Sequence, residues 1–146
     1  MSNKGGPDQF GADPCCGLIK MIRGRLPGGR RIVEFQPYGQ PAISDVIAAL
    51  HRLQDDPGFE STMPALWDFR EIDFADYSPS SCRNDAFFLN RFPNRKGIKR
   101  ACVVGNELGY GHLRMFQEVV GGFGLDDMDK FFVCYSRDEA IAWLDG

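Results

Sequence analysis

Two short apolar runs place the strongest constraint on how this chain can fold. Residues 100–105 (RACVVG) and 131–135 (FFVCY) lack the regular alternation of polar and apolar side chains that marks a strand with one solvated face. Strands of this kind are buried on both faces, which is typical of parallel strands covered by helices. We therefore predict that both runs are parallel, interior strands of an α/β sheet.

The segments around these runs predict the remaining elements. Residues 18–25 and 31–36 flank the turn sequence LPGG and predict an antiparallel hairpin. Residues 65–69 predict a third strand. Apolar stripes at helical spacing predict helices at residues 44–54, 81–91 and 106–120, and a last helix that opens at Ser136.

Local signals predict how two of these helices begin. Ser44 is expected to cap the first helix, because a hydroxyl accepts a hydrogen bond from a free amide of the opening turn. Ser136 and Glu139 have the spacing of a capping box at the start of the last helix.

The predicted order is therefore ββαβαβαβα, in which a hairpin leads into three parallel crossovers and helices pack on a mixed sheet. The 146 residues fit one domain. Residues 1–14 contain several Gly and Pro and a single aromatic side chain, so we expect them to form a flexible tail. A single α/β domain over residues 15–146 follows.

The charge balance argues against a dedicated nucleic-acid binder. The formal net charge is −3, whereas neutralising phosphates needs a concentrated excess of Lys and Arg. We interpret the two local basic clusters as solvated loops that flank strands. They consist of Arg23, Arg25, Arg30 and Arg31, and of Arg95, Lys96, Lys99 and Arg100.

The five cysteines and the absence of a long apolar stretch predict a reduced, cytoplasmic protein. Cys102 and Cys134 lie in apolar runs and are expected to be small core residues without a disulfide. Cys15 and Cys16 are too close in sequence to bridge without strain. No stretch is long enough to span a bilayer, and no signal-peptide core is present.

No motif for a cofactor, a metal ion or a catalytic nucleophile is present in the sequence. Gly105, Gly109 and Gly111 follow a strand and open a helix, but their spacing is not that of a dinucleotide-binding loop. Neither His51 nor His112 has a cysteine or a carboxylate at a recognised metal spacing. We therefore expect no cofactor and no metal.

Three segments carry a resemblance to a known fold: residues 66–71 (LWDFRE), 110–116 (YGHLRMF) and 139–144 (EAIAWL). In order and spacing they resemble the STAS fold of anti-sigma-factor antagonists, and more closely a small bacterial family grouped with STAS and CRAL-TRIO-like lipid-binding domains. The resemblance covers residues 16–144. It implies a STAS-like α/β fold and a binding or regulatory role, and it brings no reaction with it.

Anti-sigma-factor antagonists carry a phosphorylatable serine in an Asp-Ser-Ser/Thr-Gly motif, and here the matching region departs from it. The sequence reads DYSPSSC over residues 76–82, so hydroxyls are present without the motif. A phosphate on Ser80 or Ser81 would be stabilised by the free amides of a helix N-terminus. The favoured alternative is that these serines are plain helix caps.

The helix predicted at residues 106–120 is amphipathic. We place His112 on its apolar side, as a core histidine. That side consists of Leu108, Met115, Phe116, Val119 and Val120, and the opposite side of Tyr110, Arg114, Gln117 and Glu118. The glycines in its opening turn indicate close approach of a ligand or simply tight packing on the sheet.

The candidate ligand-binding residues are Asp68, Arg70, Tyr110 and Arg114. Asp68 and Arg70 end a strand, and ligands of open α/β sheets bind at that edge. Tyr110 and Arg114 are one helical turn apart, so they can contact the same object. The favoured alternative for Asp68 is structural, as a partner of Arg70 or of a helix N-terminus. The corresponding alternative for Arg114 is an ion pair with Glu118 or Asp68.

These observations favour a non-enzymatic binding or regulatory module, for a small apolar or amphipathic ligand or for a protein partner. The alternative is a small enzyme whose site is built from Asp68, Arg70, His112 and Arg114. A structural homodimer is a third hypothesis, which predicts a flat apolar patch.

Overall fold

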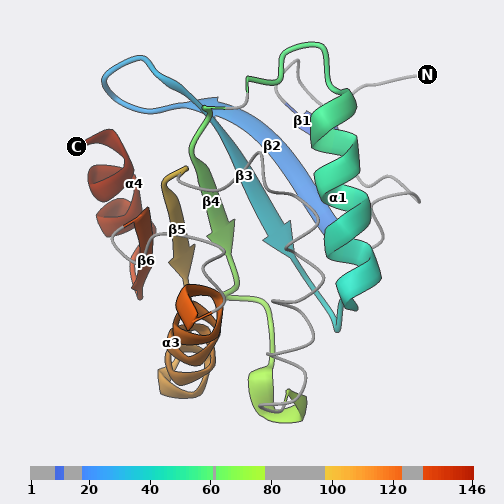
Figure 1. Cartoon of the computed structure of the whole chain (residues 1–146), viewed down its shortest axis with the longest axis vertical. Coiled ribbons are helices and arrows are strands. Elements are labelled where there is room, and N and C mark those ends of the chain that lie inside the picture. Colours follow the sequence, from blue (N-terminus) through green and yellow to red (C-terminus); the bar gives the residue numbers. More distant parts are fainter. Residues whose placement is uncertain (1–8, 12–17, 61, 78–97, 123–129) are drawn as a thin grey trace.

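The computed structural model describes residues 9–11, 18–60, 62–77, 98–122 and 130–146, and these contain a six-stranded mixed sheet (Figure 1). The strands lie in the sheet in chain order. They are β1 (Gln9–Gly11), β2 (Ile19–Arg25), β3 (Arg31–Pro37), β4 (Ala65–Asp68), β5 (Arg100–Val103) and β6 (Phe131–Cys134). Strands β1 to β3 pair antiparallel, and β3 to β6 pair parallel. The α/β class, the hairpin and the parallel strands are as predicted.

The hairpin β2–β3 closes through the predicted turn. The Leu26 amide donates to the Arg30 carbonyl at 2.8 Å, and Gly29 has a φ of 99°, which a residue without Cβ adopts at little cost. The turn is also tied to the other end of the chain, because the Gly28 amide donates to Asp145 Oδ1 at 3.0 Å.

Of the helices in the described residues, two lie on one face of the sheet and one lies on the other (Figure 1). Helix α1 (Ile43–Asp55) covers β2, β3 and β4, and helix α3 (Glu107–Gly122) covers β5 and β6 on the same face. Helix α4 (Arg137–Asp145) covers the opposite face of β4, β5 and β6. We call these the α1/α3 face and the α4 face.

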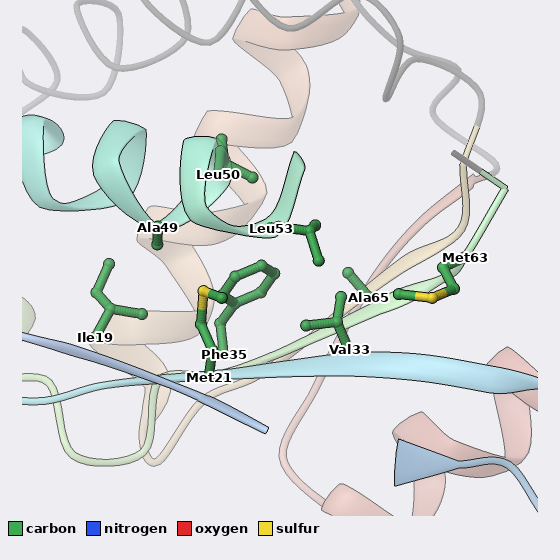
Figure 2. Packing of buried hydrophobic residues seen from close by; sticks show 9 residues of the cluster. All are labelled: Ile19, Met21, Val33, Phe35, Ala49, Leu50, Leu53, Met63 and Ala65. Atoms are coloured by element: carbon green, nitrogen blue, oxygen red, sulfur yellow. The ribbon is translucent and has the colours of Figure 1, made fainter. Parts of the chain in front are cut away.

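The core beneath α1 is a compact apolar cluster (Figure 2). Side chains of β2, β3 and β4 point toward α1, since alternate residues of a strand point to the same face. The cluster consists of Ile19, Met21, Val33, Phe35, Ala49, Leu50, Leu53, Met63 and Ala65.

The alternating residues build a second core under α4. Leu66, Val103 and Cys134 point to this face from adjacent strands and pack against Ala140 and Leu144 of α4. Lys99 caps the helix end: its Nζ donates to the backbone carbonyls of Trp143 and Gly146 at 3.1 and 3.0 Å. The predicted interior cysteines, Cys102 and Cys134, are buried and free.

The prediction that both apolar runs are interior strands is confirmed for β5 and wrong for β6. β6 is parallel to β5 but forms the last strand of the described sheet. Its continuous apolar character has the reason that we predicted, since α3 covers one face and α4 the other. Burial on both faces therefore does not require a partner strand on both sides.

Strand β1 was not predicted from the sequence. Its three residues lie within the segment that we expected to be a flexible tail, and they pair with β2 at Ile22 and Met21. Several sequence predictions fall outside the described residues: the helix at residues 81–91, the serines Ser80 and Ser81, and the cysteines Cys15 and Cys16.

The helix starts confirm one predicted cap and correct the other. Ser136 caps α4, with its Oγ accepting from the Glu139 amide at 3.3 Å. Helix α1 begins at Ile43, and its N-cap is Ala42 and not Ser44. There the Asp45 carboxylate accepts from the Ala42 amide at 2.7 Å, so an acid in the first turn replaces the hydroxyl cap.

The two glycines in the first turns of α3 have different surroundings. A Cβ on Gly109 would lie 3.0 Å from Cδ2 of Phe74 and 3.3 Å from Cβ of Val104, whereas a Cβ on Gly111 would meet no atom within 4 Å. Tight packing therefore explains Gly109 alone. The ring of Phe74 belongs to a short 3₁₀ helix, η2 (Phe74–Asp76), on which α3 rests.

This difference predicts opposite effects of the same substitution. Gly111→Ala should raise the free energy of unfolding by about 1 kcal/mol, because alanine favours a helix interior. Gly109→Ala should lower it, because overpacking costs about 1–3 kcal/mol and exceeds the gain in helix propensity. Urea denaturation measures both. Equal stabilisation by the two variants would contradict the packing of α3 on Phe74.

Among the described residues, no helix is both long enough and apolar enough to cross a bilayer.

Candidate functional site

Two buried carboxylates lie side by side on the α4 face, each bound by an arginine. Glu34 comes from the middle of β3 and Asp68 from the end of β4, with 5% and 8% of their surfaces exposed. Glu34 on β3 is paired with Leu66 on the neighbouring strand β4. Asp68 therefore lies on β4, two residues beyond the position that faces Glu34. Polar side chains this deep in a sheet face need hydrogen-bonding partners.

The partners are arginines that bind through two nitrogens each. Arg137, the first residue of α4, donates from Nη2 to Glu34 Oε1 at 2.7 Å and from Nε to Oε2 at 3.2 Å. Arg70 donates from Nη2 to Asp68 Oδ2 at 2.7 Å and from Nε to Oδ1 at 2.9 Å. Bidentate contacts of this kind fix the plane of the guanidinium group.

Both arginine side chains are partly exposed although their carboxylate partners are buried. Their side chains are 45% exposed for Arg70 and 43% for Arg137. Within the described part of the chain, Nη1 of each guanidinium makes no hydrogen bond. We call these two residues the arginine pair.

The charges of the cluster act on one another. Burial raises the pKa of Asp68, but the hydrogen bonds from the Arg70 side chain and amide and the positive charges of Arg70 and Arg137 outweigh it, so this pKa is lowered. The hydrogen bond to Glu34 raises the pKa of Arg137 above its ordinary value, against a smaller opposing effect of Arg70. Asp68 is therefore a carboxylate at neutral pH, close to both guanidinium groups.

Two further polar residues extend the cluster toward β2. Gln36 follows Glu34 on the same face of β3 and donates from Nε2 to Glu34 Oε2 at 3.0 Å. Lys20 is opposite Gln36 in the hairpin register, so its side chain leaves the sheet on the α4 face as well. Helix α4 covers the other half of this face, over β4, β5 and β6.

The other two candidate residues lie on α3, and one of them belongs to an aromatic pair. The rings of Tyr110 and Tyr135 are stacked, with centroids 5.2 Å apart and planes 10° apart. Tyr135 follows β6 and is 49% exposed. Nearby in the first turn of α3, Leu108 is 54% exposed, although we predicted it on the buried side.

Arg114 is exposed, one turn after Tyr110. In the described part of the chain it forms no ion pair, with neither Glu118 nor Asp68. Gln117, predicted on the polar side of the helix, is buried instead and donates from Nε2 to the Phe131 carbonyl at 2.9 Å.

His112 is half-buried against the 3₁₀ helix and packs on two aromatic rings, whereas we expected a histidine within the core. Its ring centroid lies 5.1 Å from that of Phe74 and 5.3 Å from that of Tyr77. Burial among these rings lowers the pKa of His112 below its ordinary value of 6.5. The imidazole is thus held in its neutral form by aromatic packing.

The structure brings the four predicted ligand-binding residues together as two pairs, not as one group. Asp68 binds Arg70 on the α4 face, whereas Tyr110 and Arg114 belong to α3, which covers the opposite face. The backbones do meet at one edge: a Cβ on Gly105, just before α3, would lie 3.4 Å from the Arg70 carbonyl oxygen. We call this rim the carboxyl edge; it comprises residues 69–71, 104–107 and 135–137.

Sequence reasoning missed Arg137 and Tyr135 at this edge, and Glu34, which binds Arg137 from the middle of β3. A signal for Glu34 was present, because it is the one acid in the apolar run of the strand at residues 31–36. No signal pointed to Arg137 as its partner, since the two are 103 residues apart and meet only through the packing of α4.

Comparisons with protein-family models, curated proteins and solved structures found no significant match to this chain. In the described residues, no three histidine, cysteine or acidic side chains gather closely enough to hold a metal ion.

The Glu34–Arg137 pair predicts an asymmetric mutational effect. Arg137→Gln should lower the free energy of unfolding by about 2 kcal/mol or more, because it leaves a buried carboxylate without its counter-ion. The double variant Glu34→Gln/Arg137→Gln should recover most of this loss, because no buried carboxylate then lacks its counter-ion. Thermal or urea denaturation measures both, with Glu60→Gln as the control.

Glu60 forms an exposed pair with Arg31 at 2.8 Å, so its variant should change stability by less than about 1 kcal/mol. If Arg137→Gln had no more effect than Glu60→Gln, the Glu34–Arg137 pair would not be the buried anchor described above.

His112 predicts a loss of stability in mild acid. Because its pKa is lower in the folded protein than its ordinary 6.5, the unfolded chain binds more protons in this range. The stability of the wild type should therefore fall as the pH drops through 6.5 and continue to fall until the pH is below the folded pKa. His112→Phe should reduce this slope, because it removes the half-buried imidazole. Equal slopes for wild type and His112→Phe would contradict the burial of a neutral imidazole.

Proposed function

We propose that this chain is a non-catalytic binding or regulatory domain whose ligand or partner contacts the carboxyl edge. The observation that supports this role is the pairing of both buried carboxylates. Glu34 and Asp68 each accept two guanidinium hydrogen bonds, and Asp68 also accepts the Arg70 amide. A general base needs an oxygen within reach of the substrate proton, and these oxygens are directed at arginines.

The enzyme alternative, a site formed by Asp68, Arg70, His112 and Arg114, has less support. Asp68 and Arg70 lie on the α4 face, and His112 packs on Phe74 and Tyr77 on the other. In the described part of the chain, no hydrogen bond orients the His112 ring, whereas a catalytic histidine is normally held by one. The proposal therefore excludes a shared acid–base mechanism for these four residues.

The carboxyl edge is suited to an amphipathic ligand. It offers exposed guanidinium edges at Arg70 and Arg137, and exposed apolar surface at Leu108 and Tyr135. Open α/β sheets bind ligands at this edge because helix starts and strand ends converge there. The ligand in this proposal is a small amphipathic molecule or a segment of a partner protein.

The resemblance to STAS-like domains agrees with such a role, and we retain the STAS-like fold identity and a cytoplasmic location as parts of the proposal. Ligand-controlled association of two copies is compatible with it. Phosphorylation of Ser80 or Ser81 would add a regulatory input, although plain helix capping is the favoured role of these serines.

A thermal-shift screen of metabolites, fatty acids and short peptides, followed by NMR mapping of the hits, tests the proposal. A specific ligand should stabilise the fold by about 2.7 kcal/mol at a concentration one hundred times its Kd. Amide signals of the carboxyl edge should shift, and Tyr135→Ala should weaken binding. The control, His51→Ala, removes an exposed ring on α1, outside the carboxyl edge. A ligand that shifts only signals away from the edge would contradict the proposal.

A further inference from the structure

The arginine pair has a geometry that its structural role does not require. A single hydrogen bond and an ion pair would neutralise each carboxylate, yet both guanidinium groups bind side-on through Nε and Nη2. This arrangement leaves Nη1 of each without a hydrogen bond in the described part of the chain, on side chains that are 45% and 43% exposed. Carboxylates that are themselves buried hold the two groups in place, which is how supporting residues preorganise a binding site.

The two carboxylates hold the guanidinium groups of Arg70 and Arg137 near one another. Glu34 and Asp68 lie on adjacent parallel strands, two residues apart in register, so their Cα atoms are about 8 Å apart from the strand spacing and rise. Each guanidinium group is within hydrogen-bonding distance of its carboxylate, and the charge of Arg70 acts on Arg137. Two neighbouring guanidinium groups can both donate to an oxyanion placed between them, at about 2.8 Å from its oxygens.

The cost of the arrangement also points to a ligand. Buried ion pairs are commonly no more stable than apolar side chains of the same size, so two of them in one sheet face are a poor means of stabilising a fold. The same face is filled by apolar residues under α4, at Leu66, Ala101 and Val103. Departures from an apolar core are expected where a site is built.

From these observations we infer that the arginine pair binds an oxyanion, a phosphoryl or carboxylate group of the ligand, between Nη1 of Arg70 and Nη1 of Arg137. This inference rests on the proposed function and names the chemistry of its ligand. Lys20 lies on the same sheet face and adds a third cation. Glu71, exposed next to Arg70, offsets part of the positive charge, so directed N–H groups and not a general field give the selectivity.

NMR titration of the arginine Nε–H signals tests the inference directly. The probes are phenyl phosphate, benzoate and inorganic phosphate, with benzyl alcohol as the uncharged match. Phenyl phosphate or benzoate should shift the signals of Arg70 and Arg137 together, with one Kd. The tighter of the two assigns a phosphoryl or a carboxylate group, and comparison with inorganic phosphate shows whether the organic part contributes.

Variants separate recognition from structure. Arg137→Lys keeps a cation beside Glu34 but removes Nη1, the guanidinium nitrogen that would donate to the ligand. Binding should weaken about tenfold or more. Because a single substitution can unfold the domain, Asp68→Asn/Arg70→Gln removes a whole ion pair and leaves no buried carboxylate without its arginine; it should weaken binding as much. The control Arg25→Gln removes a positive charge at the hairpin turn, and binding should be unchanged.

The outcomes are distinct. If no oxyanion shifts the arginine pair at millimolar concentration, or if Arg25→Gln weakens binding as much as the site variants, the inference is wrong. If benzyl alcohol or an uncharged ligand from the screen still binds the carboxyl edge, the proposed function stands without it. If nothing binds at this edge, both fail.

Discussion

The parallel strands of this sheet must be buried on both faces. Because the sheet is pleated, this requirement determines on which face each strand side chain of the candidate site lies. Phe35, Trp67, Cys102 and Val133 form one row across four strands and point toward α1 and α3. Their neighbours along each strand must then point the other way and need a second cover, which α4 provides. Because α4 covers only part of this face, its opening residue, Arg137, reaches Glu34 on β3.

The carboxyl edge follows from that arrangement. On the α4 face, the polar residues Glu34, Gln36 and Asp68 lie where the apolar cover of the helix ends, as does Lys20 on β2. Arginines from two separate segments meet these carboxylates and become rigid donors. Tyr110 of α3 and Tyr135, which follows β6, stack on one another and add aromatic surface near the same edge of the sheet, on the side of α3. The edge therefore combines fixed cations with aromatic surface, which suits recognition more than proton transfer.

Much of this fold could be predicted from local signals. The hairpin, β4, β5, α3 and the Ser136 cap all follow from patterns that a few neighbouring residues carry. The prediction failed where tertiary packing decides. Helix α3 packs on Phe74 through Gly109, and this orientation leaves Leu108 exposed. Strand β6 can lie at the edge of the described sheet because α3 and α4 together bury its two faces. Asp68 and Arg70 were identified from their place at a strand end, but Arg137 depends on a contact between residues far apart in the chain.

The ionisation of Asp68 tests the account most directly, because it decides whether the buried acid is an anchor for arginine or a free acid–base group. The measurement is a pH titration of the side-chain carboxyl carbon by ¹³C NMR. Despite burial, the hydrogen bonds and charge of Arg70 should keep the pKa of Asp68 below its ordinary 3.8, and the carboxylate should stay ionised throughout the neutral range. A pKa raised toward neutrality would mean that burial prevails and Arg70 is not bound, and it would contradict both the arginine pair and the binding role proposed for it.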